Sequence, residues 1–196
     1  MHKIIQWIRT GLLTLSLGLV GSTAAMAQSQ TSEIHGDYHL SLYPDMYGDV
    51  LEFEAFTKIA DQKSFFGLSC SSMSPFPMLQ ILLFDDDIVS ETPRFLKASY
   101  EISGLDSFKP VAMQGILQAT LTADEFSNRI RLELDPQAIP KDLRVMKSEY
   151  ARLLKQLSDG EEITVMLDHR SFGEKSYQYS LKGMDSVIQN SGSLCR

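Results

Sequence analysis

The sequence is poor in several residue types that carry chemistry. Its 196 residues include two cysteines, Cys70 and Cys195, and one tryptophan, Trp7. It has no Cys-x-x-Cys pair, no Gly-x-Ser-x-Gly elbow and no glycine-rich phosphate loop, so the local signatures of redox, serine-hydrolase and nucleotide-binding sites are missing. Lysine and arginine are also scarce, 18 against 25 Asp and Glu. Such an acidic chain repels nucleic acid and anionic lipid surfaces, which excludes both as partners.

The first 27 residues predict a cleaved secretory signal peptide. A basic start and an apolar run over residues 11–20 precede Ala25-Met26-Ala27, which supplies the small residues that signal peptidase requires. The apolar run is too short to span a bilayer. Cleavage after Ala27 would make Gln28 the first residue of the mature protein. The alternative interpretation is a retained membrane anchor.

The mature chain is the size of one domain. Removing the leader leaves 169 residues with sixteen cationic and twenty-five acidic side chains, a formal charge of −9. This length suffices to bury a core. No second apolar run approaches the length of a membrane span, so we expect one β-rich domain over 28–196, without a span, located in the periplasm or fully secreted. Residues 28–36 are polar and predict a loose N-terminal arm.

The two cysteines predict one structural disulfide. Paired cysteines are the rule in exported proteins, and no third cysteine competes for Cys70 or Cys195. The bridge would close a loop of about 125 residues, for which the loop-entropy model gives roughly 4–5 kcal/mol as an upper figure. Two free thiols, or one catalytic thiol, are the alternatives.

Alternating apolar residues predict about eight or nine β-strands. Turn residues such as Pro44, Gly48 and Asp135-Pro136 separate these segments, and residues 72–77 form a loop because Pro75 and Pro77 cannot sit in a central strand. The run from Met78 to Phe84 is continuously apolar and typical of a strand buried on both faces. The expected strands are 38–42, 50–59, 65–71, 78–84, 95–102, 111–121, 129–134, 162–169 and 176–181.

Two helices are expected. Apolar residues recur at helical spacing between Asp142 and Ser158, and Gly160 stands where a left-handed C-cap is expected. Ser148 could cap a shorter version of this helix. A second, short helix follows Gly183, after which the chain runs to Cys195. The predicted apolar stripe of the first helix is Leu143, Met146, Tyr150, Leu153, Leu154 and Leu157.

Histidines and a run of aspartates raise the question of a metal site. His35 and His39 are four residues apart, but Gly36 and the surrounding β-pattern argue against the helix that would bring them together, and nothing in the sequence brings His169 close. Asp85-Asp86-Asp87 lacks the spaced ligands and glycine of a calcium loop and is typical of a solvated turn. We expect no metal and no cofactor.

Two acidic residues could serve as an acid–base pair. Asp168 and Glu174 flank the loop around Phe172-Gly173, although acidic residues are common throughout this chain. Ser69 lies between Leu68 and Cys70 in a predicted strand, which is a poor place for an exposed nucleophile. The sequence therefore identifies no catalytic set.

Three segments together resemble a known group of exported proteins. They are Leu68-Ser69-Cys70, the helix end Lys155-Gln156-Leu157-Ser158-Asp159-Gly160, and Tyr179-Ser180-Leu181-Lys182-Gly183-Met184 running to Cys195. This order is similar to small exported bacterial proteins of the invasion-associated locus B type and to type VI secretion accessory proteins of the VasI type, over Asp49 to Cys195. The resemblance implies a periplasmic β-sandwich without known catalysis, and it transfers no site residue beyond the two cysteines.

These observations favour a mainly β protein, a single antiparallel β-sandwich-like domain with one amphipathic helix and a short C-terminal helix. The functional hypothesis is an exported, non-enzymatic protein of the bacterial cell envelope that contacts an envelope or secreted protein partner, linked to secretion or host interaction. A periplasmic hydrolase using carboxylates is one alternative. A carrier of a small ligand or lipid is another, if aromatic residues line a cavity.

Overall fold

Alternating side chains place one face of most strands in a shared core. The structure, a computed structural model, describes residues 31–57, 63–84, 94–105, 109–121, 126–135, 137, 139, 142–170, 172–192 and 194–195. The predicted leader, its cleavage site at Ala27 and Gln28, and the Asp85–Asp87 triplet lie outside the described residues.

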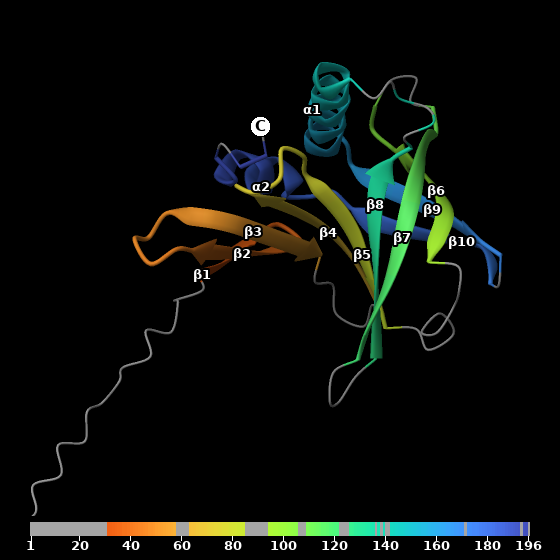
Figure 1. Ribbon diagram of the computed structural model, residues 1–196, viewed down its shortest axis with the longest axis horizontal. Helices are drawn as coiled ribbons and strands as arrows, with labels where there is room; N and C mark the ends of the chain where they lie inside the picture. The colour runs from red at the N-terminus through yellow and green to blue at the C-terminus, as the bar shows by residue number, and fades with distance from the viewer. Residues whose placement is uncertain are drawn as a thin grey trace, which may run out of the picture.

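The described residues form one antiparallel sheet of ten strands in the order β1-β2-β3-β4-β5-β8-β7-β6-β9-β10 (Figure 1). This confirms the predicted mainly β fold class. The strands are β1 (Thr31–His35), β2 (Tyr38–Pro44), β3 (Val50–Thr57), β4 (Ser64–Ser71), β5 (Met78–Leu83), β6 (Phe95–Ile102), β7 (Val111–Leu121), β8 (Phe126–Leu134), β9 (Glu162–His169) and β10 (Gly173–Ser180).

Residues 31–35, predicted as part of a loose arm over 28–36, instead form strand β1. Its residues pair with β2 in register from Thr31 opposite Leu42 to His35 opposite Tyr38. Its side chains are almost all exposed, so the strand has no apolar alternation from which it could be predicted. The tight turn at Gly36-Asp37 fixes the pairing instead, with Gly36 in the left-handed region at a φ of 58°.

The sheet curls so that its last strand packs against strands near its beginning (Figure 1). Phe66 of β4 stacks on Tyr179 of β10, with ring centroids 5.7 Å apart. The inner faces of all strands from β2 to β10 meet in one core, and the predicted sandwich closes around it. Its largest fully buried side chains are Tyr38, Tyr100, Tyr179, Phe53 and Phe66.

Two glycines allow the two ends of the described chain to meet. The turn after β1 lies against the turn after β10, and the Asp37 amide donates to the Lys182 carbonyl at 3.0 Å. Gly36 and Gly183 both have positive φ, 58° and 97°. A Cβ on Gly183 would collide with the His35 carbonyl, and one on Gly36 with the Lys182 carbonyl. Close backbone approach therefore requires glycine at both positions.

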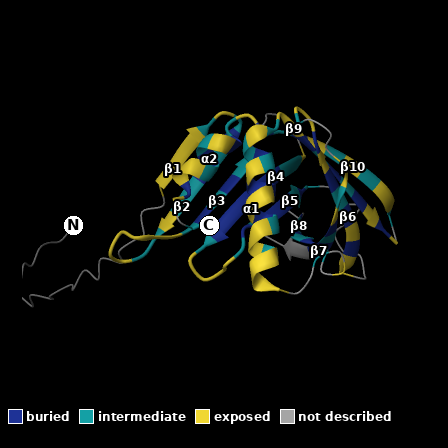
Figure 2. Ribbon diagram, turned by 90° about the horizontal axis from the view of Figure 1, so that it is seen from above, coloured by how far each residue is buried: buried dark blue, intermediate teal, exposed yellow. Residues whose placement is uncertain are grey.

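Helix α1 (Leu143–Asp159) closes one end of the sandwich (Figure 2). Its N-cap is Asp142, whose carboxylate accepts from the amides of Arg144 at 2.7 Å and Val145 at 3.4 Å, so the shorter version beginning at Ser148 is wrong. The buried part of the apolar stripe comprises Tyr150, Leu153, Leu154 and Leu157. Leu143, predicted in the same stripe, is 55% exposed because the first turn projects beyond the sheet.

Gly160 ends α1, but not by the left-handed cap predicted from the sequence. Its φ is −82° and its ψ is 167°, an extended conformation. A Cβ at this position would collide with Ile102 of β6 and press against Leu181. Glycine is needed here because the chain passes between two core side chains, not because of its backbone conformation.

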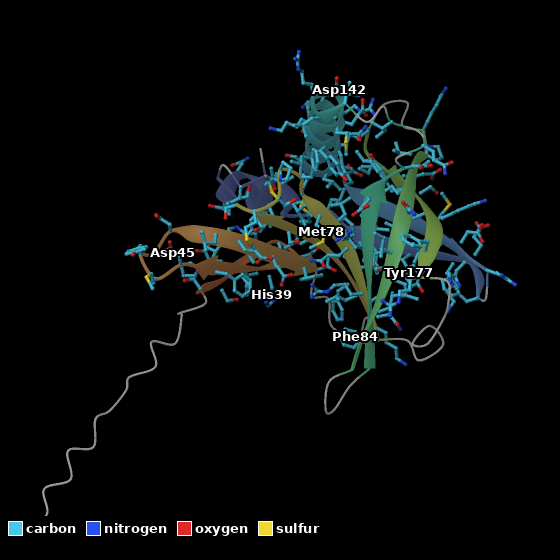
Figure 3. The ribbon with its side chains drawn as sticks, viewed as in Figure 1. His39, Asp45, Met78, Phe84, Asp142 and Tyr177 are labelled. Carbon is cyan, nitrogen blue, oxygen red and sulfur yellow. A yellow bond between two sulfur atoms is a disulfide. The ribbon has the colours of Figure 1, made fainter. Side chains whose placement is uncertain are left out.

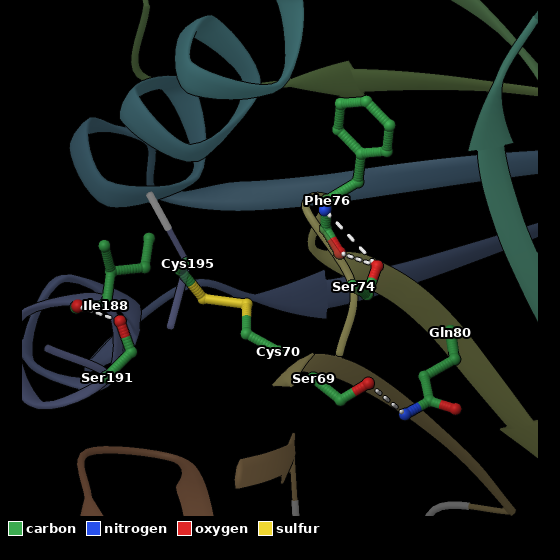
Figure 4. The surroundings of a disulfide bond; sticks show 8 residues. All are labelled: Ser69, Cys70, Ser74, Phe76, Gln80, Ile188, Ser191 and Cys195. Atoms are coloured by element: carbon green, nitrogen blue, oxygen red, sulfur yellow. Dashed lines mark hydrogen bonds between the residues drawn. A yellow bond between two sulfur atoms is a disulfide. The ribbon is translucent and has the colours of Figure 1, made fainter. Parts of the chain in front are cut away.

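A disulfide fastens the C-terminal segment to β4 (Figure 4). Helix α2 (Met184–Asn190) buries Met184 and Val187, and the chain beyond it brings Cys195 to Cys70, with their Cα atoms 5.4 Å apart. Both cysteines belong to the buried core. In the described part of the chain, neither helix has the length and apolar character needed to cross a membrane.

Candidate functional site

The histidines considered as metal ligands do not come together. His35 lies opposite Tyr38, whereas His39 lies opposite Ile34, so the two imidazoles point to different faces of the β1–β2 hairpin. His35 is within 3.1 Å of Glu33, and His169 is buried against the Phe172 ring with centroids 4.7 Å apart. Among the described residues, no group of three His, Cys, Asp or Glu side chains could hold a metal ion.

Asp168 and Glu174, the suspected acid–base pair, lie side by side on neighbouring strands. The two residues are directly opposite each other on β9 and β10, and Lys97 of β6 lies opposite Asp168 on its other side. Asp168, Glu174 and Lys97 are all exposed. They form a solvated row of charges on the surface of the sheet.

Ser69 belongs to a structural network on the outer face of the sheet. It is buried, and its hydroxyl oxygen accepts from the Gln80 amide at 3.3 Å (Figure 4). The same amide lies 3.4 Å from a Glu54 carboxylate oxygen, which Arg129 also contacts at 3.4 Å. These bonds connect β3, β4, β5 and β8 and satisfy the side-chain NH2 group of Gln80, which is fully buried in β5. Its Oε1 atom is buried without a hydrogen-bond partner among the described residues.

Large apolar side chains are instead exposed at the tip of the β2–β3 hairpin, which projects to one side of the molecule (Figure 1). The turn between β2 and β3 holds Met46 81% exposed and Tyr47 84% exposed. Its backbone is fixed by Asp45, whose carboxylate accepts from the amides of Tyr47 at 2.8 Å and Asp49 at 3.0 Å. Figure 3 shows Asp45 at the tip of this hairpin. The turn therefore presents two apolar side chains on an ordered backbone.

The loop between β4 and β5, residues 72–77, continues this surface. The Ser72 amide donates to the Leu51 carbonyl at 2.8 Å and joins the loop to the hairpin. Met73 in the loop is 90% exposed. The Ser74 hydroxyl donates to the Phe76 carbonyl at 2.9 Å (Figure 4). The Phe76 ring stacks on Tyr150 of α1 with centroids 4.9 Å apart. The loop is thus held at both ends.

Two hollows flank the contact between this loop and α1, and we call them together the α1 groove. Pro77 and Tyr150 line both. The first hollow, of about 500 Å³, lies between α1, the loop and β8, and is lined also by Phe76, Met78, Arg131, Ile139 and Met146. The second, of about 660 Å³, lies between α1 and α2, and is lined also by Pro75, Lys147, Ala151, Leu154, Lys155, Ile188 and Cys195.

Tyrosine hydroxyl groups support the groove from within. Burial raises the pKa of Tyr150, which contacts the Leu134 backbone, so this phenol stays neutral at physiological pH. Tyr100 of β6 donates to the Gln156 side chain at 3.1 Å and holds the opposite side of α1. Arg131 pairs with Glu133 at 2.6 Å at the margin of the first hollow. These contacts hold α1 and β8, which form walls of the groove.

Sequence reasoning did not identify this surface. Its signal is present between Asp45 and Asp49, where a turn of otherwise polar character carries Met46 and Tyr47. Apolar residues in a turn have no core to fill, so they indicate contact with something outside the chain. The α1 groove gives no comparable signal, because its walls come from four segments that are distant in the sequence.

Comparisons with known proteins give one structural similarity. No protein-family model matches the chain, and no curated protein matches it significantly. Among solved structures, the fold is similar to invasion associated protein b from Bartonella henselae, at 9% sequence identity and a TM-score of 0.45. The match covers 82% of this chain and 94% of that chain. The name of that protein matches one of the two protein types that the sequence resembles. Membership of this chain in that family stays a prediction.

Proposed function

We propose that this protein is exported, cleaved after Ala27, and acts at the bacterial cell envelope by binding a protein partner rather than by catalysis. Its contact surface extends from the tip of the β2–β3 hairpin to α1. This surface comprises the turn 45–49, the loop 72–77 and the α1 groove. A buried disulfide between Cys70 and Cys195 is in keeping with an oxidising compartment.

The observation that carries the proposal is the exposure of Met46, Tyr47 and Met73 on backbone that is held by hydrogen bonds. Large side chains at such exposure lose contact with water only when a partner covers them. A fixed backbone reduces the entropy lost on association, which favours binding without rearrangement. Methionine and tyrosine are also among the residue types enriched at protein interfaces.

The two alternatives have less support among the described residues. The hydrolase hypothesis rests on Asp168 and Glu174, which lie exposed in a row with Lys97. The carrier hypothesis requires aromatic residues around a cavity, whereas Tyr38, Phe53 and Tyr179 fill the core by packing together. The two hollows of the α1 groove are open to solvent and divided from each other by Pro77 and Tyr150.

Site-specific photo-crosslinking in exporting cells tests the proposal. A photoreactive amino acid placed at Tyr47 or Met73 should give the same crosslinked protein species, identified by mass spectrometry. The matched control is Phe95, which is 59% exposed but belongs to β6, outside the contact surface. Equal crosslinking from Phe95, or none from either test position, would contradict the proposal.

A further inference from the structure

We infer that the α1 groove binds an extended segment of the partner in which apolar side chains alternate with carboxylates. This inference rests on the proposed function and specifies its chemistry. The apolar side chains would enter the two hollows, and the carboxylates would face Arg131, Lys147 and Lys155 at their margins. The inference has three supports: the apolar lining, the local charge, and the division of the groove.

The apolar lining is continuous across the contact between the loop and α1. Phe76, Met78 and Met146 line the first hollow, and Leu154 and Ile188 line the second. Pro77 and Tyr150 belong to both, so a chain that leaves one hollow enters the other across these two residues. An extended peptide places every second side chain on the same side, which suits two hollows separated by a low ridge.

The charge of the groove is opposite to that of the molecule. Its lining contains three cationic residues, Arg131, Lys147 and Lys155, and two acidic ones, Glu133 and Asp159, whereas the mature chain as a whole is strongly acidic. Glu133 pairs with Arg131 and Asp159 pairs with Lys155, both at 2.6 Å. Lys147 forms no ion pair with any described residue. A partner segment with carboxylates complements this local field, and a basic one does not.

The division of the groove favours a peptide over a lipid. A fatty-acid chain needs one long enclosed channel for its hydrocarbon, and here Pro77 and Tyr150 separate the space into two parts. A peptide can cross this ridge with its backbone in solvent and insert one side chain on each side. A fatty acid, like the proposed peptide, combines an apolar group with a carboxylate. It is therefore included among the test ligands.

The predicted mature chain contains no tryptophan, so the binding of a peptide can be measured directly by fluorescence. A synthetic peptide that alternates leucine with aspartate around a single tryptophan reports its own binding by fluorescence, because Trp7 lies in the leader. The control peptide has lysine at each aspartate position and the same leucines. We expect the aspartate peptide to bind the mature protein at least about tenfold more tightly than the lysine peptide, which corresponds to about 1.4 kcal/mol.

Methyl-labelled methionine locates the bound peptide in the same experiment. NMR signals of Met78 and Met146 should shift, since both side chains line the first hollow. Signals of Met113 and Met184, which are buried in the core, should not move. Shifts confined to Met46 and Met73 would place the peptide on the hairpin and loop, and would overturn the inference while leaving the proposed contact function standing.

Three variants separate groove binding from general effects. Ala151→Gln fills the second hollow from an exposed helical position and should weaken the aspartate peptide several-fold without loss of folding. Lys147→Gln should weaken it and reduce its preference over the lysine peptide. The matched control is Arg144→Gln, which removes the same charge from α1 outside the groove. Equal effects of Lys147→Gln and Arg144→Gln would overturn the assignment of charge to the groove.

The remaining outcomes are also decisive. Equal or tighter binding of the lysine peptide overturns the inference, as does binding of neither peptide. Dodecanoate that shifts Met78 and Met146 where the aspartate peptide does not would establish a carrier and overturn it as well. Crosslinking from Tyr47 is measured independently, so failure of the groove and failure of the contact function remain distinguishable.

Discussion

The hydroxyl of Tyr38 donates a hydrogen bond of 2.8 Å to the backbone carbonyl of Ser180, 142 residues further along the chain. This bond joins the beginning of β2 to the end of β10. Burial is the main cause that raises the pKa of Tyr38 well above its ordinary value, so the donor is retained at every physiological pH. A phenol surrounded by core side chains therefore contributes to the closure of the sandwich, beside the backbone hydrogen bond from Asp37 to Lys182.

Removal of the Tyr38 hydroxyl should change the stability of the protein measurably. We expect Tyr38→Phe to lower the free energy of unfolding by about 1–3 kcal/mol, because the Ser180 carbonyl loses its donor in a part-buried site. Tyr43→Phe is the matched control, since the Tyr43 hydroxyl has only a 3.5 Å contact at an exposed position. Urea denaturation of both variants tests this, and equal changes would mean that the Tyr38 bond adds nothing.

The paired glycines give a second prediction. Gly183→Ala should destabilise the protein by at least about 2 kcal/mol more than Gly48→Ala, because both residues have positive φ but only Gly183 faces a backbone carbonyl. At Gly48, an added Cβ meets open space. Thermal and urea unfolding of the two variants measure the difference. Similar losses would show that backbone strain alone, rather than the contact with His35, governs these sites.

Helix α1 should depend on its buried stripe. Leu153→Ala is expected to cost about 2–5 kcal/mol, because the side chain is 1% exposed and its loss leaves a cavity. Lys155→Ala should cost well under about 1 kcal/mol, since its ion pair with Asp159 is exposed. Unfolding measurements that give small effects at both positions would mean that α1 is not held through this stripe.

The disulfide prediction combines mass and stability. The exported protein should begin at Gln28 and weigh two hydrogen atoms less than its reduced form, and its cysteines should resist thiol labelling until the protein is unfolded and reduced. Cys70→Ser, Cys195→Ser and the double variant should each lose a similar few kcal/mol, on the order of 2–5, because each opens the same loop. Native protein that labels readily at both thiols, or that retains Met1, would contradict this prediction.

Alkaline pH should weaken the fold through its buried tyrosines. Burial raises the pKa of Tyr100 to about 12, above the ordinary value of 10.0. The resulting stability is fully present below about pH 10 and is lost as pH rises toward 12, by at most about 2–3 kcal/mol from this residue. Tyrosinate absorbance and urea midpoints between pH 8 and 12 measure it. Tyr100→Phe should flatten the dependence, and an unchanged slope would exclude Tyr100 as its source.

Much of the fold could be predicted from the sequence because side-chain alternation is set by strand geometry. In β8, Ile130, Leu132 and Leu134 face the core while Arg129 and Arg131 face outward, as the spacing predicts. Strand β1 could not be found this way, because an exposed edge strand needs no apolar face. The left-handed cap at Gly160 was also wrong, because only the folded chain reveals the side chains that crowd this residue.

The candidate site was less accessible to sequence reasoning. Met46 and Tyr47 are apolar residues in a polar turn, which is a sequence signal of a contact surface. The signal can be interpreted only when the structure shows that both side chains are exposed. The α1 groove arises where β8, the loop 72–77, α1 and the C-terminal segment converge, and each segment alone resembles ordinary core or surface. Cys195 illustrates this difference. The sequence predicts its partner, but not that the bridge places it in the wall of the second hollow.

The contact of the first described turn with the last has a consequence for the order of folding. The β1–β2 hairpin docks on residues 181–184, so its native partner is absent until nearly the whole polypeptide has been released. Pairings between such distant segments are slow to form, because loop closure must precede them. Neighbouring strands that are consecutive in sequence can pair earlier, so completion of residues 181–184 would start only the final closure of the core.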